Sequence, residues 1–246
     1  MNDVGIIMPA LAAGALILLS HLPLGMRVLA RGIVFIDLAI AQLAGLGAML
    51  AVASSIELPF ASELGAAAMA LMGALLLTYT ERRWPERQEA LIGVAFVLAA
   101  SLSMLVLAGR PHADEELRGV LAGQILWLGW RDVCVIAIAT SALAILAWLG
   151  RKRAGGPGFY ILFALAVTMS VRYIGVFLVF ASLIIPALVA NGRSRRVVPA
   201  YLTGLTAYAT GLMLSVYTDL PAVPLIVVAM SVLALLSAVD ALRRRT

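Results

Sequence analysis

The sequence predicts an all-α fold, a polytopic bundle of transmembrane helices that occupies residues 1–246 as a single domain. Three observations lead to this class. The chain is 63% hydrophobic and 13% charged, whereas a soluble domain is about 45–50% apolar and about 25% charged. Its apolar residues gather in segments near the length of about 20 residues that a helix needs to cross a bilayer. Its basic residues stand in short clusters between those segments, as topology signals do.

Seven apolar segments have spanning length, and we expect each to be a helix. They lie at 4–22, 33–53, 63–80, 90–108, 132–150, 198–217 and 222–242. The first has Asp3 and no basic leader, so we expect a retained span rather than a cleaved signal peptide. The apolar run before Asp132 is too short to span. We expect Gln124 to pack there at the outer surface, with Trp127 and Trp130 as interfacial anchors.

The connections between the spans alternate in charge. Basic connections are "GMRVLAR", "ERRWPER", "RKR", "NGRSRR" and the C-terminal "RRR", while the N-terminus, "SSIELP", "RPHADEELR" and "YTDLPAVP" lack a basic excess. The positive-inside rule places the basic set in the cytoplasm, which predicts an external N-terminus and a cytoplasmic C-terminus. The net charge of +5 then marks topology and does not indicate a nucleic-acid partner.

The apolar block 158–190 is too long for one span and short for two. Both of its flanks, "RKR" and "NGRSRR", carry cytoplasmic signals, and a single crossing would put six arginines on the wrong side. We therefore expect a broken hairpin that enters and returns, with Arg172 near its turn. Arg172 either takes part in a transport pathway or extends to the outer headgroups. A broken hairpin is typical of a transporter core.

Two polar side chains lie in the second span. Asp37 and Gln42 are five residues apart, so on a straight helix they point about 140° apart. They are candidate metal-path residues, with two alternatives. Asp37 could be an interfacial acid paired with Arg27 or Arg31, and Gln42 could hydrogen-bond a neighbouring helix.

The remaining candidate ligand is His112, beside the acidic residues 114–116, because imidazole and carboxylates suit divalent cations. The alternative is an ordinary solvated loop.

His21 is expected to be a boundary residue at the end of the first span. Cys134 is the only cysteine, which excludes a disulfide framework. The sequence has no Walker A, H-E-x-x-H or G-x-S-x-G motif, so we expect no enzyme activity and no bound cofactor.

Four blocks in this order resemble one family. They are "RGIVFIDLAIAQLAGLGA", "RQEALIGVAFVLAASLSMLVL", "ELRGVLAGQILWLGWRDV" and "VTMSVRYIGVFLVFASLIIPALVA". Together they resemble the membrane permease of zinc, manganese and iron ABC importers, the ABC-3 type, with Glu89 in the place of the acid that precedes Ile-Gly in that family's segment. The resemblance implies a transmembrane permease in the bacterial inner membrane that imports divalent metal ions. It also implies a homodimer, a separate ATP-binding cassette ATPase and an exported metal-binding protein.

The sequence departs from that family at two places. Alignment on Phe35 puts Leu38 where the family has Asp and Gln42 where it has His, and an amide is a poor zinc ligand. The family's ATPase-docking helix is replaced by the short "RKRAGGPG" at 151–158. Arg83 and Trp84 are then the candidate ATPase contacts. Two alternative functions stay open, a transporter without ATPase coupling and a membrane scaffold that transports nothing.

Overall fold

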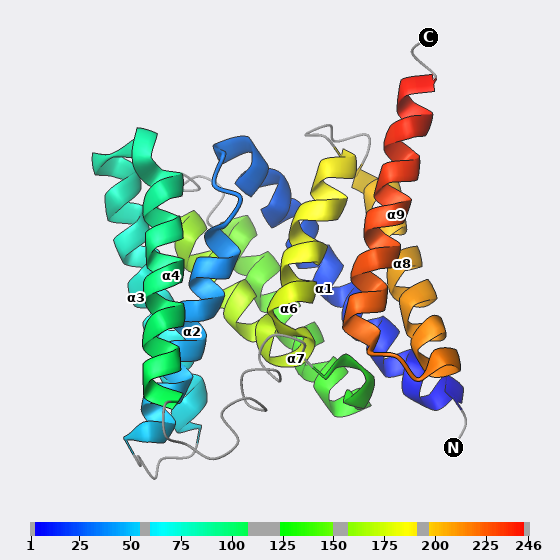
Figure 1. Ribbon diagram of the computed structural model, residues 1–246, viewed down its shortest axis with the longest axis horizontal. Coiled ribbons are helices and arrows are strands. Elements are labelled where there is room, and N and C mark those ends of the chain that lie inside the picture. The colour runs from blue at the N-terminus through cyan, green and yellow to red at the C-terminus, as the bar shows by residue number, and fades with distance from the viewer. Residues whose placement is uncertain (1–2, 55–59, 108–123, 150–156, 191–196, 244–246) are drawn as a thin grey trace. The chain divides into compact units, whose positions relative to one another are not determined.

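The computed structural model describes residues 3–54, 60–107, 124–149, 157–190 and 197–243. Within these ranges the regular elements are all helical, which confirms the predicted all-α class (Figure 1). They are α1 (Asp3–Arg31), α2 (Ile36–Ala53), α3 (Ala61–Arg83), η1 (Pro85–Arg87), α4 (Gln88–Leu107), η2 (Ile125–Trp127), α6 (Trp130–Leu149), α7 (Pro157–Ala190), α8 (Val197–Thr218) and α9 (Ala222–Arg243). His112 and the basic clusters at 151–153 and 193–196 lie outside the described residues.

Seven of the described helices are long and apolar enough to cross a membrane, namely α1, α2, α3, α4 with η1, α6, α7 and α8. A shorter apolar helix, Ala222–Ser237, follows in α9. The predicted membrane bundle is thus confirmed, with two local differences. The expected connection "GMRVLAR" is helical, because α1 continues through Pro23 to Arg31. The short segment before Asp132 is a single 3-10 turn, in which Trp127 is exposed.

The chain divides into two compact units, one built from Gly32–Val120 and Ile145–Arg172 (unit 2) and the other from the remaining residues (unit 1). In unit 2, α2 packs against both α3 and α4 (Figure 1). Gly47 and Gly65 face each other across the α2–α3 contact, and a Cβ on either one would overlap the carbonyl oxygen of the other. These two helices therefore touch backbone to backbone, as small residues permit in membrane helices.

The first arm of α7 also belongs to unit 2. The helix is interrupted at Gly175, whose φ of 75° and ψ of 164° are open to glycine and strained for other residues. The break divides α7 into arms 157–174 and 176–190. The first arm contacts the α3–α4 turn through Tyr160 and the start of α3 through Arg172. At about 1.5 Å per residue the arm 157–174 covers about 27 Å, and it runs antiparallel to α3 because Tyr160 meets the turn at the end of α3 and Arg172 meets the start of α3. The predicted return of the second arm to the same side stays a prediction.

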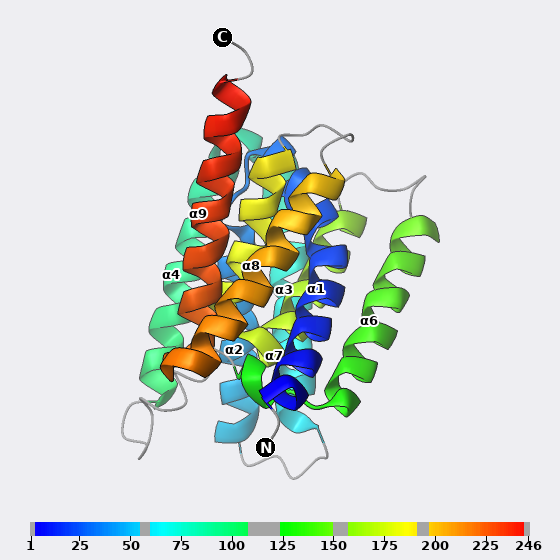
Figure 2. The same ribbon diagram turned by 90° about the vertical axis from the view of Figure 1, so that its right-hand side faces the viewer.

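Unit 1 contains α1, α8, α9 and the second arm of α7. Figure 2 shows α8 between α1 and α9. Leu22 of α1 packs with Ala187 and Ala190 of α7 and with Ala200 of α8. A buried hydrogen bond of 2.7 Å joins Ser182 Oγ of the second α7 arm to the Tyr208 hydroxyl of α8. The second arm is therefore fixed to α8 by small-residue packing and one polar contact.

Candidate functional site

Asp37 lies in the first turn of α2 and is only 1% exposed. Among the described residues, no side chain donates a hydrogen bond to either carboxylate oxygen, and the nearest donors are the backbone N–H groups of Asp37 and Leu38 in the first turn. A negative charge is favoured at a helix N-terminus, but the desolvation cost of an unpaired buried carboxylate is far larger. Such a group must be neutral or must meet a cation. The alternative of an acid paired with Arg27 or Arg31 is therefore not what the structure shows.

Glu89 lies in the first turn of α4 and reaches the start of α2. Its Oε1 accepts a hydrogen bond of 3.3 Å from the backbone N–H of Phe35, two residues before Asp37. Its Oε2 is buried and has no hydrogen-bond partner among the described residues. The N-terminal ends of α2 and α4 thus meet with two carboxyl groups, one from each helix.

Gln42 lies one turn further along α2 and is partly buried. No interruption separates it from Asp37, since α2 is helical from Ile36 to Ala53. The two side chains therefore leave the helix in different directions, as their spacing predicts. The structure brings Glu89, and not Gln42, to the end of α2 where Asp37 lies.

A buried polar network supports the turn between α3 and α4. Gln88 Nε2 donates to the Leu77 carbonyl oxygen at 2.9 Å and to the Tyr160 hydroxyl at 3.2 Å. Gln88 Oε1 accepts from Thr80 Oγ1 at 2.9 Å. Amide, hydroxyl and backbone groups satisfy one another, so this turn is held rigidly.

The exposed side of that turn carries the candidate ATPase contacts. Trp84 is 45% exposed, and its ring meets Tyr79 edge to face at a centroid distance of 6.4 Å. Arg83, the last residue of α3, is also exposed. The arrangement is a fixed aromatic pair beside a basic residue, which suits either a protein contact or the lipid headgroup region.

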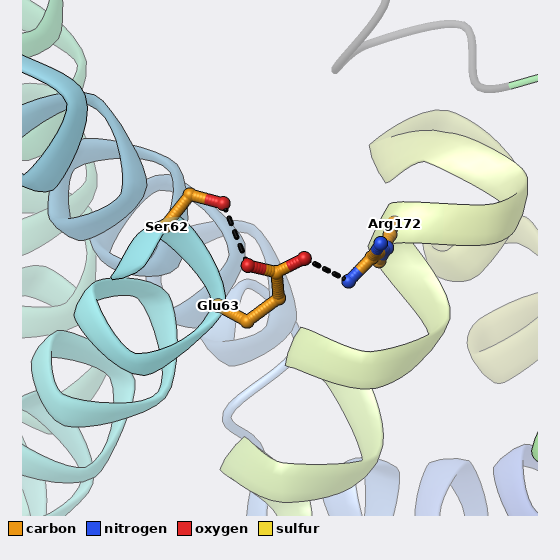
Figure 3. A network of polar contacts seen from close by, with 3 residues as sticks. All are labelled: Ser62, Glu63 and Arg172. Carbon is orange, nitrogen blue, oxygen red and sulfur yellow. Dashed lines mark hydrogen bonds and ion pairs between the residues drawn. The ribbon is translucent and has the colours of Figure 1, made fainter. Parts of the chain in front are cut away.

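Arg172 forms an ion pair at the opposite end of α3. Its Nη1 lies 2.5 Å from Glu63 Oε1, and Ser62 Oγ donates to Glu63 Oε2 at 2.9 Å (Figure 3). The Arg172 and Glu63 side chains are 59% and 36% exposed. Arg172 is three residues before the break at Gly175, and the hairpin turn expected there stays a prediction. The ion pair attaches the end of the first α7 arm to the first turn of α3.

His21 corrects one expectation. It is fully buried within α1 and is not a boundary residue, because the helix continues past it to Arg31. Its Nδ1 lies 3.0 Å from the Ile17 carbonyl oxygen, while Nε2 has no hydrogen-bond partner among the described residues. In the part of the chain that the structure describes, no three His, Cys, Asp or Glu residues come together as a metal cluster.

Sequence reasoning missed Glu63 and Gln88. Glu63 begins an apolar segment on the side predicted to be external, and Arg172 is the unmatched charge near the predicted turn on that same side. Opposite charges at one membrane depth are the signal that could have paired them. Gln88 stands beside Glu89 in a basic connection, and nothing in its sequence context predicts burial.

The comparisons with known proteins agree with this architecture. The model of the ABC 3 transport family matches residues 3–154 and 157–241. The zinc uptake membrane protein ZnuB of Haemophilus influenzae is 24% identical, over 94% of this chain and 96% of its own length. A Chlamydia muridarum protein named "Probable metal transport system membrane protein" is 24% identical, over 85% of this chain and 80% of its own.

A solved structure supports the fold independently. A chain of PsaBC from Streptococcus pneumoniae, in complex with Fab, aligns with a TM-score of 0.73 and 20% identity, over 96% of this chain and 91% of that one. The family match extends through every described span, including both arms of α7. This chain is a multi-pass membrane protein that belongs to the ABC 3 transport family.

Proposed function

We propose that this chain is the permease subunit of an ABC importer that carries divalent metal ions across the bacterial inner membrane. The observation that carries the proposal is the family match over nearly the whole chain. The relatives named above support metal ions as the cargo. ATP hydrolysis belongs to a separate ATP-binding cassette subunit, an exported metal-binding protein delivers the ion, and two copies of the permease form the path.

The geometry supports a path that involves unit 2. Asp37 is a buried carboxylate without a side-chain partner among the described residues, and such groups in membrane proteins mark ion pathways. Gln42 lies further along α2, which the predicted orientation directs toward the external side. His112 is a further candidate ligand, in the connection "RPHADEELR" that is predicted to be external.

Cation uptake tests this function. In cells that lack their own metal importers, the complete transporter should restore uptake of manganese or zinc. Asp37→Asn should reduce uptake at least about tenfold while membrane expression stays normal, because a neutral amide attracts a cation far less. Gln42→Ala should cause a smaller loss. Asp219→Asn, at an exposed acid between α8 and α9, is the matched control. Equal uptake in Asp37→Asn and wild type would remove Asp37 from the path.

The ATPase partner needs a docking surface, and the family's usual docking segment is short in this chain. We assign the contact to the α3–α4 turn, because Trp84 and Arg83 are exposed while the Gln88 network holds the backbone beneath them. Trp84→Ala combined with Arg83→Glu should abolish co-purification with a candidate ATP-binding cassette ATPase. Retained binding would exclude this turn. If wild type captures no ATPase either, a transporter without ATPase coupling becomes the better function.

A further inference from the structure

Gln88 joins the α3–α4 turn to the first arm of α7. Its side chain is 3% exposed, and both ends of its amide are bonded. Nε2 donates to the Leu77 carbonyl oxygen at 2.9 Å and to the Tyr160 hydroxyl oxygen at 3.2 Å, while Oε1 accepts from Thr80 Oγ1 at 2.9 Å. Three helices of unit 2 therefore meet at one side chain, which are the end of α3, the first residue of α4 and the first turn of α7.

The bond to Tyr160 differs from the other two in the distance that it spans along the chain. Thr80 and Leu77 lie 8 and 11 residues from Gln88 and belong to the same pair of neighbouring helices. Tyr160 lies 72 residues from Gln88, at the start of another span. The first two bonds shape the turn, whereas the third attaches the turn to a helix that is distant in the sequence.

The α7 end of this bond is firmly packed. Tyr160 and Phe163 are fully buried, and Phe159 is 2% exposed. The Phe159 ring meets the Tyr160 ring edge to face and lies against the Phe163 ring, with a centroid distance of 5.6 Å in each pair. A close-packed interior transmits a displacement and does not absorb it. A shift of the Tyr160 hydroxyl is therefore a shift of the first turn of α7.

The same arm is attached to α3 at its other end. The ion pair of Arg172 with Glu63 lies twelve residues beyond Tyr160, which is about 18 Å of helix rise. The first α7 arm is thus held at one end by a buried neutral contact and at the other by an exposed ion pair. Because both contacts lie within unit 2, a displacement of the α3–α4 turn also displaces this arm.

The outer side of the turn is the surface assigned above to the ATPase. Arg83 and Trp84 are exposed there, and Trp84 precedes Gln88 by four residues. The segment that stands in place of the family's docking helix, "RKRAGGPG" at 151–158, leads in the sequence directly to Tyr160. The bond between Gln88 and Tyr160 therefore connects the exposed turn to the helix that a docking helix would otherwise join.

We propose that the hydrogen bond between Gln88 and Tyr160 carries the movement of a docked ATPase from the α3–α4 turn to the first arm of α7. Gln88 and Tyr160 are then positioning residues of the transport cycle. The inference rests on the proposed function, since it needs an ATPase at this turn. A buried amide whose nitrogen and oxygen are both bonded cannot rotate without breaking a bond, so displacement of the turn moves the partners with it.

The complete transporter in proteoliposomes tests this transmission. The chain is reconstituted with a candidate ATPase and metal-binding protein, and uptake of Mn²⁺ and of Zn²⁺ is measured together with ATP hydrolysis. Tyr160→Phe removes the hydroxyl and keeps the buried ring. It should lower the number of ions taken up per ATP hydrolysed about three- to tenfold, the change that loss of one hydrogen bond supports. Co-purification of the ATPase should stay at the wild-type level, because Arg83 and Trp84 are unchanged.

Thr80→Val is the matched control within the same network. It removes one bond to Gln88 and leaves the bond to Tyr160. It should therefore lower the free energy of unfolding and keep the wild-type ratio of uptake to hydrolysis, whereas a purely structural network would lower that ratio equally in both variants. Tyr217→Phe, which removes a hydroxyl from an exposed side chain of α8, controls for the loss of a tyrosine hydroxyl.

The outcomes separate this inference from the function on which it rests. A wild-type ratio in Tyr160→Phe, or an equal loss in Thr80→Val, would overturn the inference while the transport function stands. Loss of ATPase co-purification in Tyr160→Phe would make Tyr160 part of the docking surface and would also overturn its role in transmission. If the wild-type transporter captures no ATPase or takes up neither ion, the proposed function fails and the inference fails with it.

Discussion

The ion pair between Arg172 and Glu63 gives a quantitative prediction. Arg172 Nη1 and Glu63 Oε1 are 2.5 Å apart, and the side chains keep 59% and 36% of their exposure. Unit charges about 4 Å apart attract by about 1 kcal/mol in water and about 4 kcal/mol at an effective dielectric constant near 20. These exposures put the pair near the first value, and exposed pairs measured by double-mutant cycles give about 0.2–1 kcal/mol. We expect a coupling free energy of about 1 kcal/mol.

The cycle uses Glu63→Gln, Arg172→Gln and the double variant, with the free energy of unfolding measured by denaturant titration in detergent. Exchanging the charges, with Glu63→Arg and Arg172→Glu together, should restore most of the unfolding free energy that the single variants lose. Ser62→Ala is the control, because it removes the neighbouring hydrogen bond and leaves both charges. If the losses of unfolding free energy in the two single variants add up to the loss in the double variant within about 0.3–0.5 kcal/mol, the ion pair contributes nothing to stability. A coupling above about 3 kcal/mol would mean that the pair is dry, contrary to its exposure.

Three further predictions follow from the fold. Gly175→Ala should lower the free energy of unfolding by about 1–3 kcal/mol, because φ near 75° with ψ near 164° is strained for any residue with a side chain. Gly93→Ala is its control: an added Cβ there meets open space, so the variant should be neutral or slightly stabilising in the same titration. Gln88→Leu should cost about 2–3 kcal/mol in that assay, because the buried network loses its central amide and leaves other polar groups without partners. Single cysteines at Arg153 and Arg193 should react with a membrane-impermeant thiol reagent from the same side, the cytoplasm; labelling from opposite sides would refute the hairpin.

The sequence predicted the spans well because their signal is local. Apolar length and charge clusters identify a membrane helix without reference to its neighbours. The same signals do not mark helix ends. Basic residues at Arg27 and Arg31 indicate a side of the membrane, and α1 simply continues through them. The excess length of 158–190 required a break, and the glycine within "RYIGV" supplies the conformation for it, three residues after the charge that attracted attention.

Of the candidate site, the sequence predicted the acid Asp37 but not the contact between Glu89 and the start of α2. An acid inside an apolar span is visible in the sequence, so Asp37 could be named. The absence of a side-chain donor around it depends on how the neighbouring helices pack against α2. The bond from Phe35 to Glu89 joins residues 54 positions apart, and no local pattern encodes a contact of that separation. The family resemblance pointed to Gln42 by register, whereas the packing brings Glu89 to the start of α2.

The close approach of Gly47 and Gly65 has a mechanical consequence. Where two helices are separated by a layer of side chains, they can slide as rotamers repack. Here no side chain separates the two backbones at the contact, so rotamer changes there cannot let α2 slide along α3, and we expect the two helices to move together. The pair is about 27 Å long along α2 and about 35 Å along α3. It behaves as a stiff lever, with Asp37 at one end and Glu63 at the other. A tilt at the Asp37 end would displace the arginine-bound end in the opposite direction, without any side chain between them changing its conformation.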